Sequence, residues 1–263
     1  MTVSKRALAG ALAFFATPAA LAQTAGKVEP TQLGQAQHRW HPVSLTSGGA
    51  SVITFERPDR RRRLGSLEQV LPAPGSLEQS TAVEIFADDV TLVAGQGLQP
   101  SELGFGRLSD LRRASYRWYR DSSSTATPFL ATAFRLMVHD PDDGEYGSTW
   151  YLVYEPVYAG YHPTVPVDTW VRSNVHSSTV WRYPVYLNGQ LPPADYCRNH
   201  SSECYRYDRT PLDWEFGPNA VVISVQLTTG GGWSGTYRGY VDDVRLRFRG
   251  RQGGRHIWNF EPL

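Results

Sequence analysis

The chain has 263 residues, and its 26 Lys and Arg against 25 Asp and Glu give a formal net charge of +1. So even a balance lacks the basic excess that is typical of nucleic-acid-binding proteins. Aromatic residues make up 12 % and charged residues 19 %, with 24 Gly and 18 Pro. This composition excludes a disordered or mainly helical chain and favours a folded one with many turns.

The first 22 residues have the pattern of a secretory signal peptide. Lys5 and Arg6 precede an apolar run that ends in Ala20-Leu21-Ala22, and small residues in this arrangement are typical of a cleavage site. The run is shorter than the ~20 apolar residues of a membrane span. We predict cleavage after Ala22, a secreted or periplasmic location and no membrane span in the mature chain. A retained membrane anchor is the alternative.

Cleavage there would remove two basic residues and no acidic one, leaving 24 basic and 25 acidic side chains and a net charge of −1. We therefore expect no nucleic-acid partner. Residues 23–48 mix Gln, Thr, Pro, Gly and His without a period, which predicts a linker or flexible arm. The remaining residues, 49–263, have a suitable length for a single β-sandwich domain.

Ten segments after residue 50 have the alternation, or the β-branched and aromatic content, of short strands. Clusters of Gly, Pro, Asp, Asn and Ser separate them, and only Pro100–Arg113 is expected to form a helical turn or two. This pattern predicts an all-β fold, a two-sheet antiparallel β-sandwich of jelly-roll type. The predicted strands are Ser51–Phe55, Thr81–Phe86, Ser115–Tyr119, Leu130–Val138, Thr149–Glu155, Thr169–Arg172, Thr179–Leu187, Ala220–Leu227, Tyr237–Phe248 and His256–Phe260.

Cys197 and Cys204 are the only cysteines of the chain. In a protein exported to an oxidising compartment, two lone cysteines this close predict a disulfide. Closing so short a loop stabilises a fold by about 2.5 kcal/mol in the chain-entropy model, so this bridge is expected to fix a local loop. The alternative, a pair of metal thiolates, lacks the further cysteines of a zinc site.

Three motifs resemble a family of exported bacterial proteins of undefined function, over most of residues 50–261. They are Ser115 to Thr125 (SYRWYRDSSST), Val167 to Trp170 (VDTW) and Gly232 to Val244 (GWSGTYRGYVDDV). In that family a Phe-Glu step opens the domain and another closes it, as at Phe55-Glu56 and Phe260-Glu261. Many members end in a hydrophobic sorting tail. This chain stops at Leu263 without one, from which we expect release or periplasmic residence.

A looser resemblance, to the galactose-binding and carbohydrate-binding jelly-roll modules of secreted enzymes, implies a structural calcium. In those modules an early Phe-Glu and a late Asp-Asp-Val help to hold the ion, which places ligands at Glu56, Asp242 and Asp243. Calcium binds hard oxygen ligands, and in an alternating strand only one of the two aspartates points inward. The alternative is that both carboxylates cap a strand or pair with arginines such as Arg238 or Arg245.

A second acidic cluster, Asp140 to Glu145, lies between two predicted strands. Its carboxylates are as dense as those of a calcium loop, but the twelve-residue spacing of an EF-hand is missing. Asp143-Gly144 supplies the positive-φ positions of a tight turn. A hairpin turn is therefore the prediction here, with a calcium loop as the alternative.

Aromatic faces can stack on sugar rings or fill a sandwich core. Trp118 and Trp150 lie within predicted strands, so we assign them to the core. Trp214 and Trp233 lie among loop residues, and the glycines around Trp233 give its backbone the freedom to expose the ring. Trp214, Trp233 and Tyr237 are therefore the predicted ligand-binding residues.

The four arginines Arg60–Arg63 are predicted to form a solvated loop, and an acidic glycan, a phosphate surface or a processing protease as their partner is the alternative. The sequence contains no G-x-S-x-G elbow, H-E-x-x-H pair, P-loop or dinucleotide fingerprint. A glycosidase or lyase needs only two converging carboxylates, for which Glu84, Glu155 and Asp168 are candidates.

From these features we predict an exported, non-catalytic binding module whose ligand is a glycan or another cell-surface polymer. The alternative is a structural or interaction protein of the cell envelope or extracellular matrix without a small ligand.

Overall fold

The structure is a computed structural model, and it describes residues 40–43, 50–54, 66–71, 80–101, 103–230, 235–250, 254–258 and 260. The predicted signal peptide, Glu56, Arg60–Arg63 and Trp233 lie outside the described residues, so the predictions for them stay predictions. Within the described residues, no helix has the length and apolar character needed to cross a membrane.

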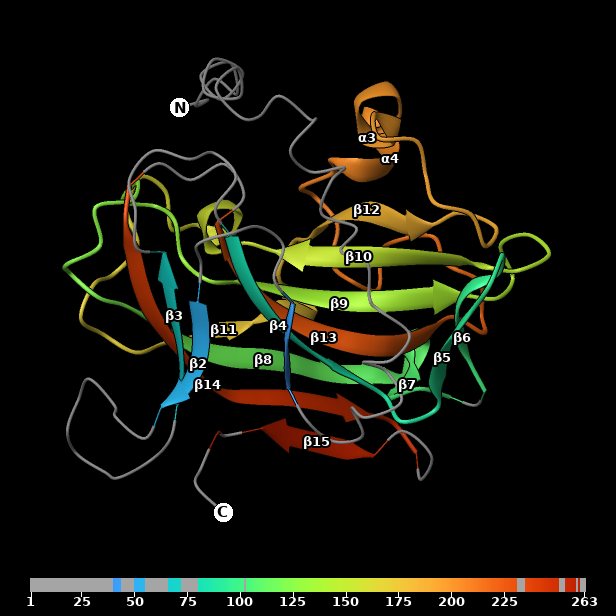
Figure 1. The fold of residues 1–263 in the computed structure, drawn as a ribbon, viewed down its shortest axis with the longest axis horizontal. Coiled ribbons are helices and arrows are strands. Elements are labelled where there is room, and N and C mark those ends of the chain that lie inside the picture. Colours follow the sequence, from blue (N-terminus) through green and yellow to red (C-terminus); the bar gives the residue numbers. More distant parts are fainter. Residues whose placement is uncertain are drawn as a thin grey trace, which may run out of the picture.

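Two antiparallel sheets pack face to face, which confirms the predicted β-sandwich (Figure 1). Sheet A has the order β1-β4-β13-β9-β10-β12, with β7 beside β13; sheet B has the order β11-β8-β14-β3-β2, with β15 beside β14; β5 and β6 form a separate hairpin. The strands are β1 (His41–Val43), β2 (Ala50–Thr54), β3 (Ser66–Leu71), β4 (Ser80–Phe86), β5 (Val90–Val93), β6 (Gly97–Pro100), β7 (Gly106–Arg107), β8 (Leu111–Arg120), β9 (Ala133–Asp140), β10 (Ser148–Tyr154), β11 (Val171–Asn174), β12 (Trp181–Tyr186), β13 (Val221–Gly230), β14 (Tyr237–Phe248) and β15 (Arg255–Trp258).

Helical structure is short in the described part of the chain. It consists of the 3-10 turns η3 (Leu108–Asp110), η4 (Pro156–Ala159) and η5 (Val175–Ser177), and of two four-residue α-helices, α3 (Tyr196–Asn199) and α4 (Ser201–Cys204). The segment Pro100–Arg113, expected to hold a helical turn or two, contains η3 alone. The other described residues of that segment belong to strands and their connections, because β8 begins at Leu111.

Alternating side chains of both sheets form the core. Tyr116 of β8 is fully buried, with its ring centroid 5.2 Å from that of Phe134 in β9 and 6.0 Å from that of Tyr154 in β10. Trp118 is also fully buried, and its indole N–H donates to the Ser173 hydroxyl at 2.9 Å. Buried rings with satisfied polar atoms of this kind stabilise a sandwich. The core assignment of Trp118 is confirmed.

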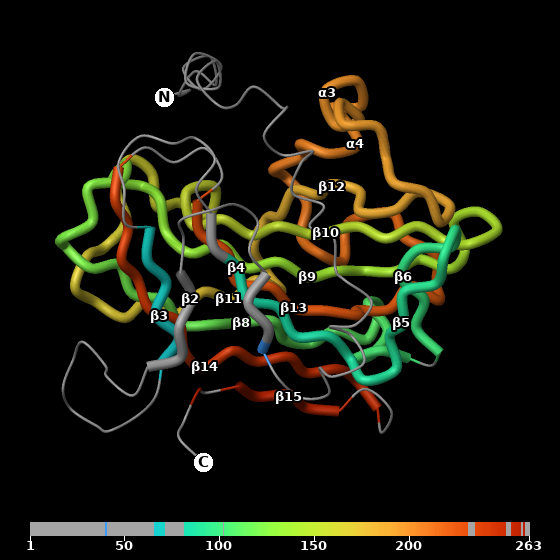
Figure 2. Tube along the Cα trace, viewed as in Figure 1, coloured from blue at the N-terminus to red at the C-terminus, as the bar shows by residue number. Residues whose placement is uncertain are grey.

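Segments far apart in the sequence lie side by side in sheet B. β3 and β14 pair through Gln69 and Gly239, and the tube of Figure 2 shows the cyan and red segments adjacent. β3 lies between β2 and β14. The strand that ends two residues before Glu56 is therefore not a direct neighbour of the strand that carries Asp242.

Candidate functional site

A pocket of about 530 Å³ opens at the β12 edge of sheet A. Its lining comes from the β9–β10 turn, from β10, from β12 and the two residues that follow it, from the loop that contains α3 and α4, and from residues 215–217. The lining residues are Asp140, Asp142, Asp143, Ser148, Trp150, Arg182, Leu187, Asn188, Tyr196, Glu203, Glu215, Phe216 and Gly217. We call this cavity the edge pocket.

The β9–β10 connection is the predicted hairpin turn, with Gly144 at φ +86°. Asp140 accepts a hydrogen bond from the Gly217 N–H at 2.8 Å. Asp142 accepts from the N–H and the side-chain amide of Asn219 at 3.0 and 3.1 Å, and these bonds lower its pKa. Both carboxylates thus fix the 217–219 segment. Among the described residues, no group of three or more His, Cys, Asp and Glu is placed to hold a metal ion.

Arg182 of β12 lines the edge pocket and lies among aromatic rings. Its guanidinium carbon is 4.2 Å from the ring centroid of Trp150 and 4.6 Å from that of Trp214, and Phe216 lies at 5.5 Å. Its Nε donates to the carbonyl oxygen of Glu203 at 2.8 Å. Burial lowers the pKa of Arg182, but an arginine stays charged in proteins. The surrounding rings and the hydrogen bond to Glu203 therefore hold the Arg182 guanidinium in a fixed orientation.

Trp214, a predicted ligand-binding residue, supports Arg182 from behind. The ring is buried, and its N–H donates to the carbonyl oxygen of Val180 at 3.2 Å. Trp150, predicted to be a core residue, is also buried and contributes to the floor of the pocket. The half-buried rings of Tyr196 and Phe216 line the opening instead.

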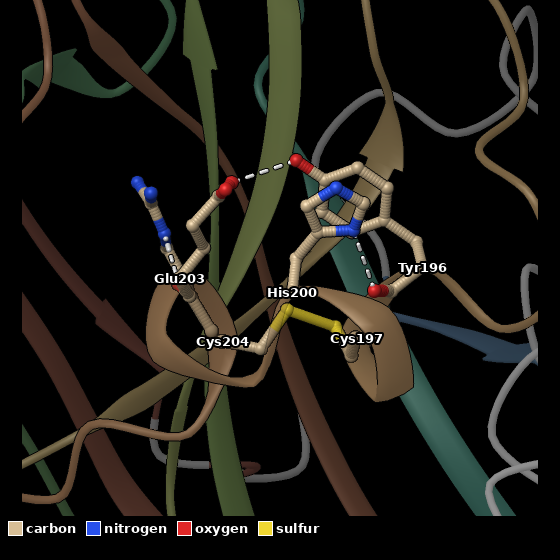
Figure 3. Close-up of a disulfide and its surroundings, with 6 residues drawn as sticks. Tyr196, Cys197, His200, Glu203 and Cys204 are labelled. Carbon is tan, nitrogen blue, oxygen red and sulfur yellow. Dashed lines mark hydrogen bonds between the residues drawn. A yellow bond between two sulfur atoms is a disulfide. The ribbon is translucent and has the colours of Figure 1, made fainter.

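The loop beside the edge pocket is closed by the predicted disulfide between Cys197 and Cys204, whose Cα atoms are 5.6 Å apart. Figure 3 shows that Tyr196 and Glu203, the residues next to the two cysteines, face each other. The Tyr196 hydroxyl donates to Glu203 at 2.7 Å, and the His200 ring stacks on Tyr196 at 4.2 Å. Burial and the bond to Glu203 raise the pKa of Tyr196 to about 12. Tyr196 is thus a neutral hydrogen-bonding group at physiological pH.

Replacing both cysteines by serine is expected to destabilise the fold by about 2.5 kcal/mol, because the variant loses the entropic restriction of a short loop. Urea unfolding measures this loss. Arg198→Gln, an exposed change inside the same loop, should leave the urea midpoint unchanged. A loss well above 5 kcal/mol would show that the bridge holds the whole domain together.

The third predicted ligand residue, Tyr237, is buried and does not line the edge pocket. It is 1 % exposed in β14, its hydroxyl is 3.2 Å from the Thr132 hydroxyl, and the Arg120 guanidinium lies 5.7 Å from its ring centroid. A ring so enclosed offers no face to a sugar. Strand alternation explains why the ring points inward, because Tyr237, Gly239 and the core residue Val241 lie on the same side of β14.

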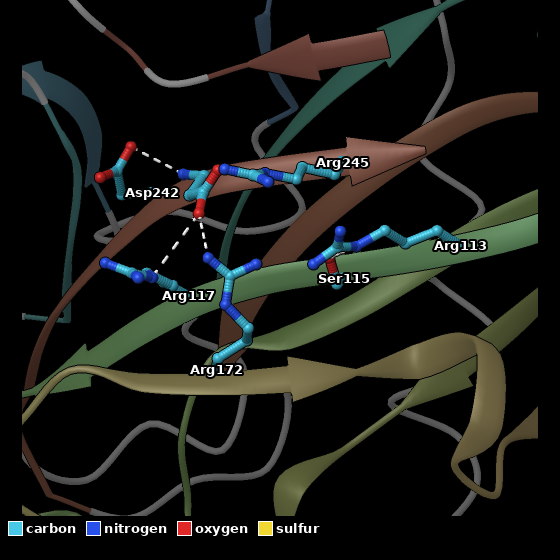
Figure 4. A network of polar contacts seen from close by, with 7 residues as sticks. Arg113, Ser115, Arg117, Arg172, Asp242 and Arg245 are labelled. Atoms are coloured by element: carbon cyan, nitrogen blue, oxygen red, sulfur yellow. Dashed lines mark hydrogen bonds and ion pairs between the residues drawn. The ribbon is translucent and has the colours of Figure 1, made fainter. Parts of the chain in front are cut away.

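Figure 4 shows the surroundings of the two predicted calcium ligands of β14. Asp242 lies opposite Arg117 of β8 in the ladder, is 4 % exposed and accepts a hydrogen bond from the Asp243 N–H at 2.6 Å. The ladder with β8 shifts register between Asp242 and Arg245, and Asp243 adopts φ 55° in this bulge. The bulge turns the Asp243 side chain outward to Arg117, Arg172 and Arg245.

Three guanidinium groups around one carboxylate repel a cation, so Asp243 does not fit a calcium site. Its surroundings match the alternative of arginine pairing, with Arg245 among the partners. A calcium held by Glu56 and Asp242 stays a prediction, because Glu56 lies outside the described residues.

The three candidate catalytic carboxylates have separate surroundings. Glu84 accepts hydrogen bonds from Tyr151, Ser224 and Gln226 on the outer face of sheet A. Glu155 accepts from the Trp181 indole N–H at 2.9 Å. Asp168 accepts from the Tyr119 hydroxyl at 3.2 Å and the Ser122 N–H at 3.0 Å, beside β8 of the other sheet.

No family model matches this sequence, and no curated protein matches it. Among solved structures, it is similar to a family 11 carbohydrate-binding module from Clostridium thermocellum in complex with a β-1,3-1,4-mixed-linked tetrasaccharide. The identity is 11 % and the TM-score 0.41, over 80 % of this chain and 88 % of that one.

Two further solved structures are similar at the level of the fold. One is TmCBM61 in complex with β-1,4-galactotriose, at 10 % identity and a TM-score of 0.31, over 82 % of this chain and 94 % of that one. The other is an exo-β-agarase, at 11 % identity and a TM-score of 0.34, of which the match covers 24 %. Similarities this low leave the function to be decided by the edge pocket itself.

Proposed function

We propose that this protein is an exported, non-catalytic module that binds a neutral polysaccharide in the edge pocket. The observation that supports the proposal is the meeting of half-buried rings, one fixed guanidinium and exposed carboxylates in a single cavity. Tyr196 and Phe216 supply apolar ring faces, Arg182 supplies donors, and Glu203 and Glu215 supply acceptors. These are the partners that a pyranose needs, because it combines an apolar face with a rim of hydroxyl groups.

The charge of the edge pocket sets the kind of sugar. Five carboxylates and one arginine line it, so a uronate or a sulfated sugar would meet like charge. Hydroxyl groups of a neutral sugar donate to carboxylates and accept from a guanidinium in charge-assisted hydrogen bonds. A neutral polymer of hexoses or pentoses is therefore the ligand class that fits.

Affinity electrophoresis and titration calorimetry on β-glucan, galactan, xylan and mannan test the proposal. We expect binding to at least one of them. Tyr196→Ala and Glu203→Gln should each weaken it at least tenfold, which corresponds to about 1.4 kcal/mol. Asp208→Asn removes an exposed carboxylate a few residues away and is the matched control, with an expected change below twofold.

Two results would reject the proposal. Absence of binding to all four polymers would favour the structural or interaction protein, and full binding by Tyr196→Ala would exclude the edge pocket. Export is a separate part of the proposal and rests on the first 22 residues. Mass spectrometry of protein recovered from outside the cytoplasm should find its first residue at Gln23, whereas an intact Met1 would contradict export with cleavage.

A further inference from the structure

We infer that the outer face of sheet B binds an acidic polysaccharide. This inference is independent of the edge pocket, since it concerns the other sheet and the opposite charge. Six arginines from four adjacent strands share that face, because residues directly opposite one another in a ladder point to the same side. They are Arg113, Arg117, Arg172, Arg245, Arg247 and Arg255, and we call them the arginine face.

The register of the strands places like charges opposite each other. Arg247 of β14 faces Arg113 of β8 on one side and Arg255 of β15 on the other. Like charges directly opposite in a sheet are destabilising. Arg247 takes part in two such pairs, so this arrangement of charges destabilises the fold. An anionic ligand bound between the arginines would relieve the repulsion.

The carboxylates described on this face neutralise only part of its charge. Asp243 pairs with Arg117 at 3.6 Å and with Arg172 and Arg245 more closely, and these three arginines are labelled in Figure 4. Arg113 donates to the Ser115 hydroxyl at 3.2 Å. Within the described ranges, none of Arg113, Arg247 and Arg255 forms an ion pair. These three cations are therefore available to a ligand.

The arginine face continues into a pocket of about 560 Å³ at the β14–β15 end of the sheet. Arg247 and Arg255 line it together with Arg112, Arg249 and the ring of Phe248. No acidic residue is among its described lining residues. Arg247 and Arg255 of the arginine face thus line one pocket together with two further arginines, and an anionic group can enter it.

The extent of the arginine face favours a polymer over a small ion. Adjacent strands are about 4.8 Å apart, so four strands spread the cations over about 15 Å. Guanidinium groups bind carboxylate and sulfate groups through paired hydrogen bonds. A polysaccharide with an anionic group on each repeat presents charges along such a length.

Nucleic acid fits this surface less well. The mature chain is expected to be net acidic, whereas nucleic-acid-binding domains are usually basic as a whole. Binding of single strands also relies on exposed aromatic rings that stack on bases, and among the described residues of this face the exposed large apolar side chain is the aliphatic Ile257. The observations therefore favour an acidic polysaccharide.

The test measures retention of the full chain in gels that contain polygalacturonate or dextran sulfate, with neutral dextran and single-stranded and duplex DNA in parallel. We expect retention by at least one acidic polysaccharide and none by dextran, with affinity falling as NaCl rises. The polygalacturonate and dextran sulfate arms distinguish a carboxylate from a sulfate ligand, and retention by either supports the inference.

Arg247→Gln/Arg255→Gln should weaken this retention at least tenfold. Arg198→Gln/Arg206→Gln removes the same charge near the disulfide, from the exposed Arg198 and from the half-buried Arg206 beside Asp208, and should change it less than twofold. The urea midpoint of the first variant should equal or exceed that of the parent, since it loses like-charge repulsion. Equal losses in both variants, no retention by either acidic polymer, or tighter binding to DNA would each overturn the inference.

Discussion

Arg120→Met is expected to destabilise the protein by about 3 kcal/mol, although the change affects neither the edge pocket nor the arginine face. Arg120 is 3 % exposed at the end of β8. It donates to the carbonyl oxygens of Leu130 and Ala126, each at 2.5 Å, and to that of Ser124 at 3.4 Å. Its removal leaves buried acceptors without a donor, and each such loss costs about 1–3 kcal/mol.

Urea unfolding of two further variants checks the cause. Arg120→Lys keeps the positive charge but not the planar fork that reaches several carbonyl groups at once, so it should recover only part of the loss. Arg112→Met changes an exposed arginine on the same strand and should stay within about 0.5 kcal/mol of the parent. Full stability of Arg120→Met would show that water or other donors satisfy the three carbonyl groups.

The stability gained or lost by Glu84→Gln should depend strongly on pH. Burial raises the pKa of Glu84, and the hydrogen bonds from Ser224, Tyr151 and Gln226 offset this only in part. A carboxyl with a raised pKa in the folded state stabilises the fold when protonated. This contribution is lost as pH rises from the unfolded value near 4.5 through the raised folded value. A neutral glutamine has no such loss.

The variant should therefore gain stability relative to the parent as the pH rises above about 4.5. Each tenfold by which folding lowers the acid dissociation constant of a carboxyl group corresponds to about 1.4 kcal/mol of the difference in unfolding free energy between the two proteins. Urea unfolding of both proteins at a series of pH values measures it. His139, whose pKa is lowered by burial, acts in the opposite direction but equally in both proteins. A difference that stays constant with pH would contradict a buried, weakly acidic Glu84.

The alternation of apolar and polar residues predicts most of the fold. All ten predicted strands form, with ends shifted by a few residues. β3 is absent from the prediction because Gln69 breaks its pattern. That side chain is fully buried and donates to the carbonyl oxygen of Leu227 at 3.2 Å. A buried amide looks like a solvent-facing residue until its distant partner is known. β1 (His41–Val43) lies in the segment predicted as an arm and joins sheet A as an edge strand.

The candidate site is much less predictable, since it is assembled from distant segments. Trp150, Arg182, Tyr196 and Phe216 come from four parts of the chain, and no local motif connects them. Two features of the sequence do point to this site. Tyr196 and Glu203 each directly precede one of the two cysteines, and the acidic turn at 140–145 contributes lining residues to the edge pocket. Trp214, predicted as a ligand-binding residue, is buried with the guanidinium of Arg182 over its ring, and only the fold shows this arrangement.

Footprinting with hydroxyl radicals tests the central claim most directly. The protein is oxidised with and without the neutral polysaccharide that binds it most tightly in the panel, and the labelled residues are identified by mass spectrometry. The proposal predicts at least threefold protection of Tyr196 and Phe216, with Tyr158 and Tyr207, half-buried elsewhere, unchanged. Unaltered labelling of Tyr196 and Phe216 under saturating polysaccharide, or protection confined to other residues, would contradict it.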